Sequence, residues 1–211
     1  MVRAILLIFE PVAAWNRILR AERRTAFILL AHLLPLLLLT SFCEGYGLVH
    51  WGKPRGVLRE ITQPKYFTHG EAVLFEAGQF LLSLAVVFVG AGMLRSVAET
   101  FCARNTYTDA FSVVAYGLSP LFLLRIADAA PQLSPWVSWT VGILLSIGAL
   151  YHGVPRMMEP DPSHAFGLFV ISSVVLVLIS GMVRFVTWWY LAGRFTGLES
   201  VISDLAPRLH L

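Results

Sequence analysis

Charged residues are scarce in this sequence. Asp, Glu, Lys and Arg make up 14% of its 211 residues, whereas hydrophobic residues make up 57%. A soluble domain carries about 25% charged residues, so this chain has too few to cover a surface that faces water. The mean hydropathy of +0.71 agrees with this reading. The composition excludes an ordinary soluble protein and predicts an integral membrane protein.

Cysteine is almost absent as well. The two cysteines, Cys43 and Cys102, form no CxxC pair, and no histidine pair at zinc spacing accompanies them. We therefore predict no metal site and no cofactor. The topology given below places the two residues on opposite sides of a membrane, so both thiols are expected to be free.

Catalytic and nucleic-acid-binding patterns are missing too. The sequence contains no serine nucleophile elbow, no HExxH and no phosphate-binding glycine loop, so we predict no enzyme activity. The net charge of +3 comes from 16 basic residues that form no basic stripe with interleaved aromatics. This excludes a nucleic-acid partner. The modest basic excess suits contact with anionic lipid headgroups.

Long apolar segments are what the chain does contain. Each is continuously apolar over about twenty residues, which is the length that a helix needs to cross a bilayer. A barrel strand would instead alternate over about ten residues. We predict an all-α, polytopic transmembrane helical bundle of about five spans over 25–192, followed by a polar C-terminal tail, 193–211. The expected spans are 25–42, 72–97, 108–127, 135–158 and 164–192.

Residues 1–24 are predicted to form an interfacial amphipathic segment. Trp15 lies on the apolar side of a helix, and Arg17, Arg20 and Arg24 lie on the other. This pattern is typical of a helix on the membrane surface, with Trp15 at headgroup depth and the arginines toward lipid phosphate. The alternative is an amphipathic helix that packs on the rest of the protein. Basic residues beside the first span also predict a cytoplasmic N-terminus and, after five spans, a C-terminus outside.

Proline interrupts the third predicted span. Pro120 cannot donate a hydrogen bond to the carbonyl of Tyr116, and its ring crowds that carbonyl. The fourth span has a matching pattern around Pro155. We predict that the two breaks meet in a polar notch that serves as a small binding site or hinge, and the alternative is two kinks that serve packing alone. The binding or hinge candidates are Tyr116, Gly117, Pro120, Tyr151, His152, Gly153, Pro155 and Arg184.

Ionisable residues cluster near the span ends, where snorkelling to the interface explains most of them. Arg125 and Asp128 are three apart on a helix and are predicted to pair with each other. The guanidinium of Arg184 is expected to face the bundle or a partner. His32 is expected to be a hydrogen-bonded packing residue. A cytoplasmic ionic cluster is predicted from Arg95, Glu99, Arg104 and Asp109.

The order of these segments resembles the Yip1 domain family, in its bacterial branch. Phe9–Ile18 resembles the family's proline-then-tryptophan opening, and Ala98–Phe101 with Thr106–Phe111 resembles its turn into the third span. Tyr116–Pro120 and Leu150–Pro155 are similar to its proline-bearing elements in the third and fourth spans. The resemblance implies an integral membrane protein without known catalysis. It also implies a cytoplasmic N-terminus, in this case in a bacterial inner membrane.

Three functions are compatible with this pattern. The leading hypothesis is a non-enzymatic scaffold or accessory subunit that binds membrane lipids, another membrane protein or a second copy of itself. Ala149 and Gly153, four apart, permit close helix contact for such a role. A small transporter with a permeation path through the notch, built around His152, Tyr116 and Arg184, is the alternative. A membrane-embedded enzyme acting on lipid is the third and would need a convergent polar pocket.

Overall fold

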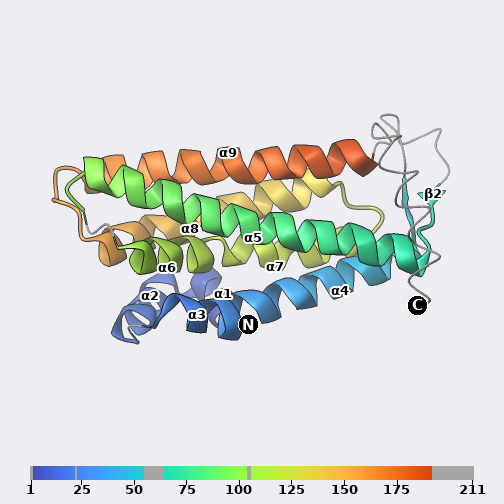
Figure 1. The fold of residues 1–211 in the computed structure, drawn as a ribbon, viewed down its shortest axis with the longest axis horizontal. Helices are drawn as coiled ribbons and strands as arrows, with labels where there is room; N and C mark the ends of the chain where they lie inside the picture. Colours follow the sequence, from blue (N-terminus) through green and yellow to red (C-terminus); the bar gives the residue numbers. More distant parts are fainter. Residues whose placement is uncertain (1, 22, 55–63, 104–105, 192–211) are drawn as a thin grey trace.

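The computed structural model describes residues 2–21, 23–54, 64–103 and 106–191, and these residues form an elongated helical bundle (Figure 1). The predicted all-α fold with five membrane-spanning segments is confirmed. The helices before the first loop are α1 (Val2–Phe9), α2 (Pro11–Arg20), α3 (Thr25–Ile28), the π-helical turn η1 (Leu29–Leu33) and α4 (Leu34–His50). Those after it are α5 (His69–Thr100), α6 (Tyr107–Gly117), α7 (Ser119–Leu124), the 3-10 turn η2 (Arg125–Ala129), α8 (Pro135–Met158) and α9 (Ala165–Leu191).

Five segments of the described chain are long and apolar enough to cross a membrane. They are Thr25–His50, His69–Thr100, Tyr107–Ala129, Pro135–Met158 and Ala165–Leu191. The first is longer than expected, because α4 continues past Phe42 to His50. Cys43 therefore lies in a helix instead of a loop, and both it and Cys102 are free thiols.

The second span begins earlier than expected because of a capping box at its N-terminus. The hydroxyl of Thr68 accepts a hydrogen bond from the backbone N–H of Glu71 at 3.3 Å, and the Glu71 carboxylate accepts one from the backbone N–H of Thr68 at 2.9 Å. This reciprocal pair satisfies two N–H groups that a helix start otherwise leaves free. α5 therefore begins at His69.

The bundle has two distinct ends (Figure 1). We call one the hairpin end, because the short antiparallel strands β1 (Lys53–Pro54) and β2 (Pro64–Lys65) lie there beside the end of α4 and the start of α5. We call the other the α2 end, where α2 and α3 lie near the α5–α6 and α8–α9 connections. The predicted tail 193–211 lies outside the described residues.

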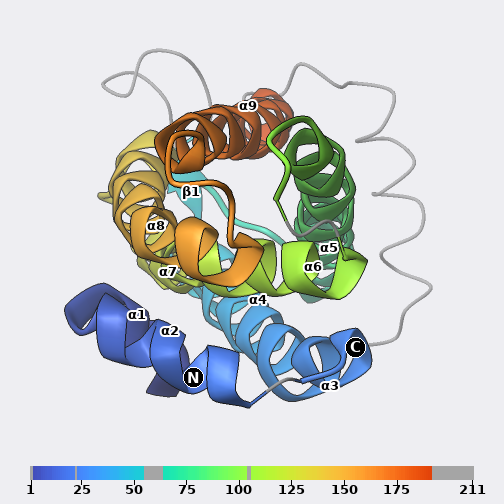
Figure 2. The same cartoon turned by 90° about the vertical axis from the view of Figure 1, so that its left-hand side faces the viewer.

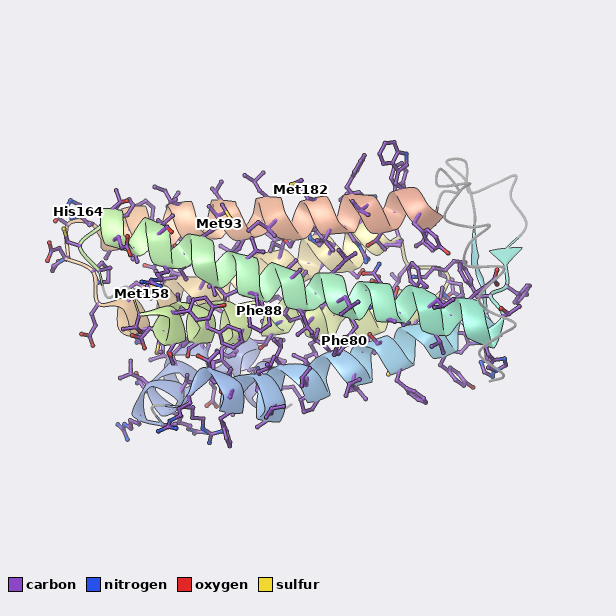
Figure 3. All side chains as sticks on the ribbon, in the orientation of Figure 1. Phe80, Phe88, Met93, Met158, His164 and Met182 are labelled. Carbon is purple, nitrogen blue, oxygen red and sulfur yellow. The ribbon has the colours of Figure 1, made fainter. Side chains whose placement is uncertain are left out.

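The third span lies in the middle of the molecule. Seen from the α2 end, α9, α5, α6 and α8 surround a common centre, while α4 and the N-terminal helices lie outside α6 (Figure 2). In the most apolar stretch of the third span 78% is accordingly buried, whereas the corresponding share in α9 is 28%. Met182 of α9 projects from the outer surface and is 71% exposed, as is expected of a residue that faces lipid (Figure 3).

The prolines have different effects on the three helices that contain them. In the first span a π turn ends at Leu33, two residues before Pro35. The third span is interrupted at Leu118, between α6 and α7, as Pro120 predicts. The matching break that we predicted in the fourth span is wrong, because α8 continues through Pro155 to Met158. Pro155 removes the hydrogen bond that a residue there would donate to the Tyr151 carbonyl, but α8 extends only three residues further, so little of the helix depends on that bond.

Candidate functional site

Six charged side chains are buried together at the hairpin end of the bundle. None is more than 8% exposed. Charge inside a membrane protein is costly unless it is paired, so such residues mark a candidate site. The acidic members are Glu44, Glu76 and Asp128, and the basic members are Lys53, Arg125 and Arg184. We call this set the ionic network.

Glu44 and Arg125 form the centre of the network. Arg125 donates to one carboxylate oxygen of Glu44 from Nη2 at 2.9 Å and from Nε at 3.3 Å. Lys53 Nζ lies 3.0 Å from the other oxygen of Glu44. Because Lys53 belongs to β1, this contact ties the hairpin to the first and third spans. Charge-assisted hydrogen bonds of this kind are stronger than neutral ones, and they also fix the relative orientation of the two side chains.

The second span adds two further contacts to Arg125. Its Nη2 lies 3.0 Å from Glu76 Oε2, and its Nη1 donates to the Ser83 hydroxyl at 3.4 Å. One guanidinium therefore joins three spans: the first, the second and its own. Its planar, multiple-donor geometry suits this role better than a lysine ammonium.

Asp128 and Arg184 connect the third and fifth spans. Arg184 Nη2 lies 2.6 Å from Asp128 Oδ2. The same guanidinium donates to the Pro135 carbonyl, and Ser138 donates its hydroxyl to Asp128. The expectation that Arg184 faces the bundle is confirmed. The predicted Arg125–Asp128 pair is wrong, because each of these residues bonds to a different span.

A close approach of two backbones makes the network possible. A Cβ at Gly47 of α4 would lie 2.4 Å from the carbonyl oxygen of Ala129 in η2. Any larger residue at position 47 would push the two segments apart. Glu44 lies one turn before Gly47, and Arg125 lies at the start of η2, so the glycine brings the two charged groups within reach. The side chains of Arg125, Asp128 and Glu76 are thus buried in ion pairs inside the bundle. They do not snorkel to the interface, as the sequence predicts for ionisable residues near span ends.

A cavity of about 50 Å³ adjoins the network between α5, α7, α8 and α9. Arg125, Asp128 and Arg184 line it, together with Ser180. Trp139 also lines it, and its buried indole N–H has no hydrogen-bond partner among the described residues. The volume of the cavity and the charged groups in its wall suit one or a few water molecules.

Trp15 anchors the N-terminal helices at the opposite end of the bundle. Its side chain is fully buried, and its indole N–H donates to the carbonyl of Ala149 in α8 at 2.8 Å. A Cβ at Gly153 would lie 2.3 Å from the Trp15 ring, so only glycine leaves room for it. Trp15 therefore contacts protein instead of lipid, and α2 packs on the rest of the protein, which is the second of the two arrangements that the sequence allows. The small residues Ala149 and Gly153 receive this intramolecular contact.

Protein atoms fill the predicted notch between the third and fourth spans. A Cβ at Gly117 would lie 2.4 Å from the Leu150 side chain. Trp15 packs edge-on against Tyr116, with ring centroids 6.4 Å apart. The break at Pro120 thus faces α8 side chains and Trp15. The hydroxyl of Ser119, beside the break, donates to the Ala115 carbonyl and lies 2.8 Å from His32 Nε2, which confirms the expected hydrogen-bonded packing role of His32.

The other notch candidates lie apart from Arg184. Tyr151 is exposed, and its ring contacts those of His152 and Phe169. Arg184 contacts the first residue of α8, and His152 lies about 25 Å further along that helix at 1.5 Å per residue. The structure therefore does not bring His152, Tyr116 and Arg184 together as one site.

The predicted cytoplasmic ionic cluster is only partly assembled. Arg95 and Glu99 lie 3.9 Å apart as an exposed pair on α5. Asp109 instead accepts a hydrogen bond from the Thr106 hydroxyl at 2.5 Å, as part of the N-cap of α6. Arg104 lies outside the described residues. Arg17, Arg20 and Arg24 of the N-terminal segment are exposed, as expected.

Glu44, Lys53 and Ser83 are members of the site that sequence reasoning missed. The predicted spans leave Glu44 and Lys53 between the first and second helices, and they place Ser83 within the apolar second span. The available signal was a set of four ionisable residues in or beside three of the predicted spans: Glu76, Arg125, Asp128 and Arg184. Within the described ranges, no group of three or more His, Cys, Asp or Glu residues is arranged to hold a metal ion.

Comparison with known families gives one match. The family model of the Yip1 domain matches residues 5–184, a range that includes α2, the first four spans, most of the fifth and the ionic network. No curated protein and no solved structure matches the chain.

Proposed function

Because the chain belongs to the Yip1 domain family of membrane proteins, we propose that it is a non-enzymatic accessory protein or scaffold. It binds lipid, another membrane protein or a second copy of itself through its outer surface, chiefly around the N-terminal helices.

The closed interior is the observation that carries this proposal. The ionic network contains equal numbers of acidic and basic groups, and each contacts a group of opposite charge. Leu150 and Trp15 fill the space at the helix break. Buried pairs of this kind cost desolvation energy and are retained for a specific arrangement rather than for stability. The buried charged groups are engaged in contacts that hold the five helices together. A partner would therefore bind at the outer surface.

The outward face of α2 is the surface that best supports a binding role. It combines exposed Arg17 and Arg20 with exposed apolar side chains, including Val12 at 42%. Trp15 holds this helix against α8, so the exposed face is presented in a fixed orientation. A fixed amphipathic face lowers the entropy lost on binding a partner.

The proposed orientation has the α2 end in the cytoplasm of a bacterial cell and the hairpin end outside. It is supported by the exposed arginines of α2 next to the first span. Lys53, Arg125 and Arg184 at the opposite end are buried in ion pairs and contribute little to an exposed positive charge. Uncompensated positive charge favours the cytoplasmic side.

Site-specific photo-cross-linking in native membranes tests this function. A photoreactive residue at Val12 is expected to give a discrete adduct with another membrane protein or with a second copy. The control is the same residue at Leu178, which is 60% exposed on the membrane-spanning helix α9. Adducts that are absent or equal at the two positions, together with a monomer after mild solubilisation, would contradict the proposal.

A small transporter is the second candidate, and the cavity beside Arg125 and Arg184 is the observation that favours it. The unpartnered indole N–H of Trp139 leaves a donor for a polar solute there. Proteoliposomes would then swell in gradients of small polar solutes, and Trp139→Phe would change the rate. Liposomes that swell no faster than empty ones would remove this candidate.

A further inference from the structure

A groove of about 430 Å³ lies at the α2 end between α2, α3, the start of α6 and the end of α8. This volume is in the range of small-molecule binding sites. Four charged residues line it. They are Arg23 and Arg24 on one wall, and Asp109 and Glu159 on the others.

The groove lies where three of the spans end. Arg24 immediately precedes the first span, Asp109 is in the first turn of the third, and Glu159 immediately follows the fourth. The ends of apolar spans mark the boundary between hydrocarbon and headgroups. The charged residues of the groove therefore lie at the depth of lipid headgroups.

Two contacts hold the walls of the groove in place. The bond from Trp15 to Ala149 fixes α2 on α8. The Thr25 hydroxyl donates to that of Thr108 at 3.2 Å, which joins the start of α3 to the start of α6. The groove is thus formed before any ligand enters, a condition that favours binding.

The floor of the groove is apolar. Ile18, Ile28 and Met157 line it and are each at most 8% exposed. At the rim, the guanidinium carbon of Arg23 lies 4.4 Å from the centroid of the Phe27 ring, a cation–π contact that restrains the side chain. A ligand in this site therefore has one apolar part and one charged part.

The charge of the rim is divided between its walls. Glu159 adopts a left-handed backbone with φ of 43°, which is costly for a residue other than glycine or asparagine. Glu159 is exposed at this helix end and lines the groove. A purely anionic headgroup would meet this carboxylate and that of Asp109. A zwitterionic headgroup, in contrast, carries a positive group that can pair with the carboxylates and a negative group that can pair with the arginines.

We propose that the groove binds a phospholipid whose headgroup carries both a phosphate and a primary ammonium, of the phosphatidylethanolamine type. Arg23 and Arg24 bind the phosphate, and Asp109 and Glu159 bind the ammonium, while the apolar floor contacts the upper acyl chain. A choline headgroup carries the same charges but has no N–H to donate, so it binds less tightly. This inference rests on the proposed function and names the lipid that this surface takes.

Native mass spectrometry of the purified full-length protein tests the inference. The protein is mixed with equimolar phosphatidylethanolamine, phosphatidylcholine and phosphatidylglycerol of identical acyl chains. The ethanolamine adduct is expected to exceed each of the others at least about fivefold, the effect of one charge-assisted hydrogen bond. Equal adducts, or a preference for phosphatidylglycerol, would overturn the proposal.

Paired variants assign the two walls. Arg23→Gln with Arg24→Gln is expected to reduce adducts of all three lipids. Asp109→Asn with Glu159→Gln is expected to abolish the preference for ethanolamine over choline while binding persists. The matched control is Arg17→Gln with Arg20→Gln, which removes the same charge from α2 outside the groove. A control that lowers binding as much as the Arg23 and Arg24 variant would overturn the proposal. Lipid selectivity is measured separately from cross-linking at Val12. The lipid proposal can therefore fail while the proposed function holds, and the reverse is also possible.

Discussion

The indole N–H of Trp15 donates to the carbonyl of Ala149 at 2.8 Å, which joins the second helix of the chain to the fourth membrane span. This bond and the glycine beneath the ring make α2 an integral part of the bundle. The groove and the exposed α2 face both depend on that attachment.

Enlarging Gly153 should detach α2 from the bundle. Gly153→Ala places a Cβ 2.3 Å from the Trp15 ring and is expected to lower the free energy of unfolding by about 1–3 kcal/mol through overpacking. The measurement is an SDS titration in mixed micelles. The control is Gly148→Ala in the same helix, where a Cβ meets nothing within 4 Å. An equal effect at the two positions would contradict the docking of Trp15 on Gly153.

Removing the charge of Glu44 should be far more damaging than removing that of an exposed glutamate. Glu44→Gln leaves Lys53 and Arg125 without their shared partner, and the expected loss of unfolding free energy is about 3–5 kcal/mol. Glu99→Gln, which breaks the exposed Arg95 pair, should cost at most about 1 kcal/mol. Similar midpoints of thermal unfolding for the two variants would show that the ionic network does not hold the helices together.

A double-mutant cycle tests the pairing of Asp128. The cycle with Asp128→Ala and Arg184→Ala should give a coupling energy of about 1–3 kcal/mol, because the two side chains are in direct contact. The cycle of Asp128 with Arg125 should give a smaller value. A larger coupling energy with Arg125 than with Arg184 would contradict the structure and would support an ion pair between Arg125 and Asp128.

The close approach at Gly47 can be tested through a single methyl group. Gly47→Ala is expected to separate α4 from η2, because its Cβ would lie 2.4 Å from the Ala129 carbonyl oxygen. The predicted loss is about 1–3 kcal/mol of unfolding free energy. Gly78→Ala in α5, where the space is open, is the matched control and should be neutral within about 1 kcal/mol. Tolerance of both substitutions would argue against the backbone contact.

Local chemistry made part of this fold predictable. Continuous apolar runs required five membrane-spanning helices, and Pro120 required an interruption of the third. Pro155 did not break α8, because its effect depends on position. It lies near the helix end, where the Arg156 side chain also donates to the His152 carbonyl at 2.8 Å.

The candidate site was less predictable, because it depends on how helices are rotated about their axes. An apolar run with few charges does not say which side of the helix faces the centre. Glu44, Glu76 and Arg125 meet only in one rotational arrangement of three spans. The same limit applies to Trp15, since an amphipathic pattern is compatible with docking on lipid or on protein.

The closed interior is the central claim of this account, and the accessibility of a thiol at Ser180 tests it most directly. Ser180 lines the cavity beside Arg184 and is 5% exposed. Ser180→Cys would be introduced with Cys43→Ser and Cys102→Ser, and treated with a charged, membrane-impermeant thiol reagent from each side. A cysteine at Gln132, an exposed position, serves as the reactive control. We predict full protection at position 180 in the folded protein and reaction after unfolding in SDS. Rapid labelling from both sides would contradict a closed interior and support a permeation path.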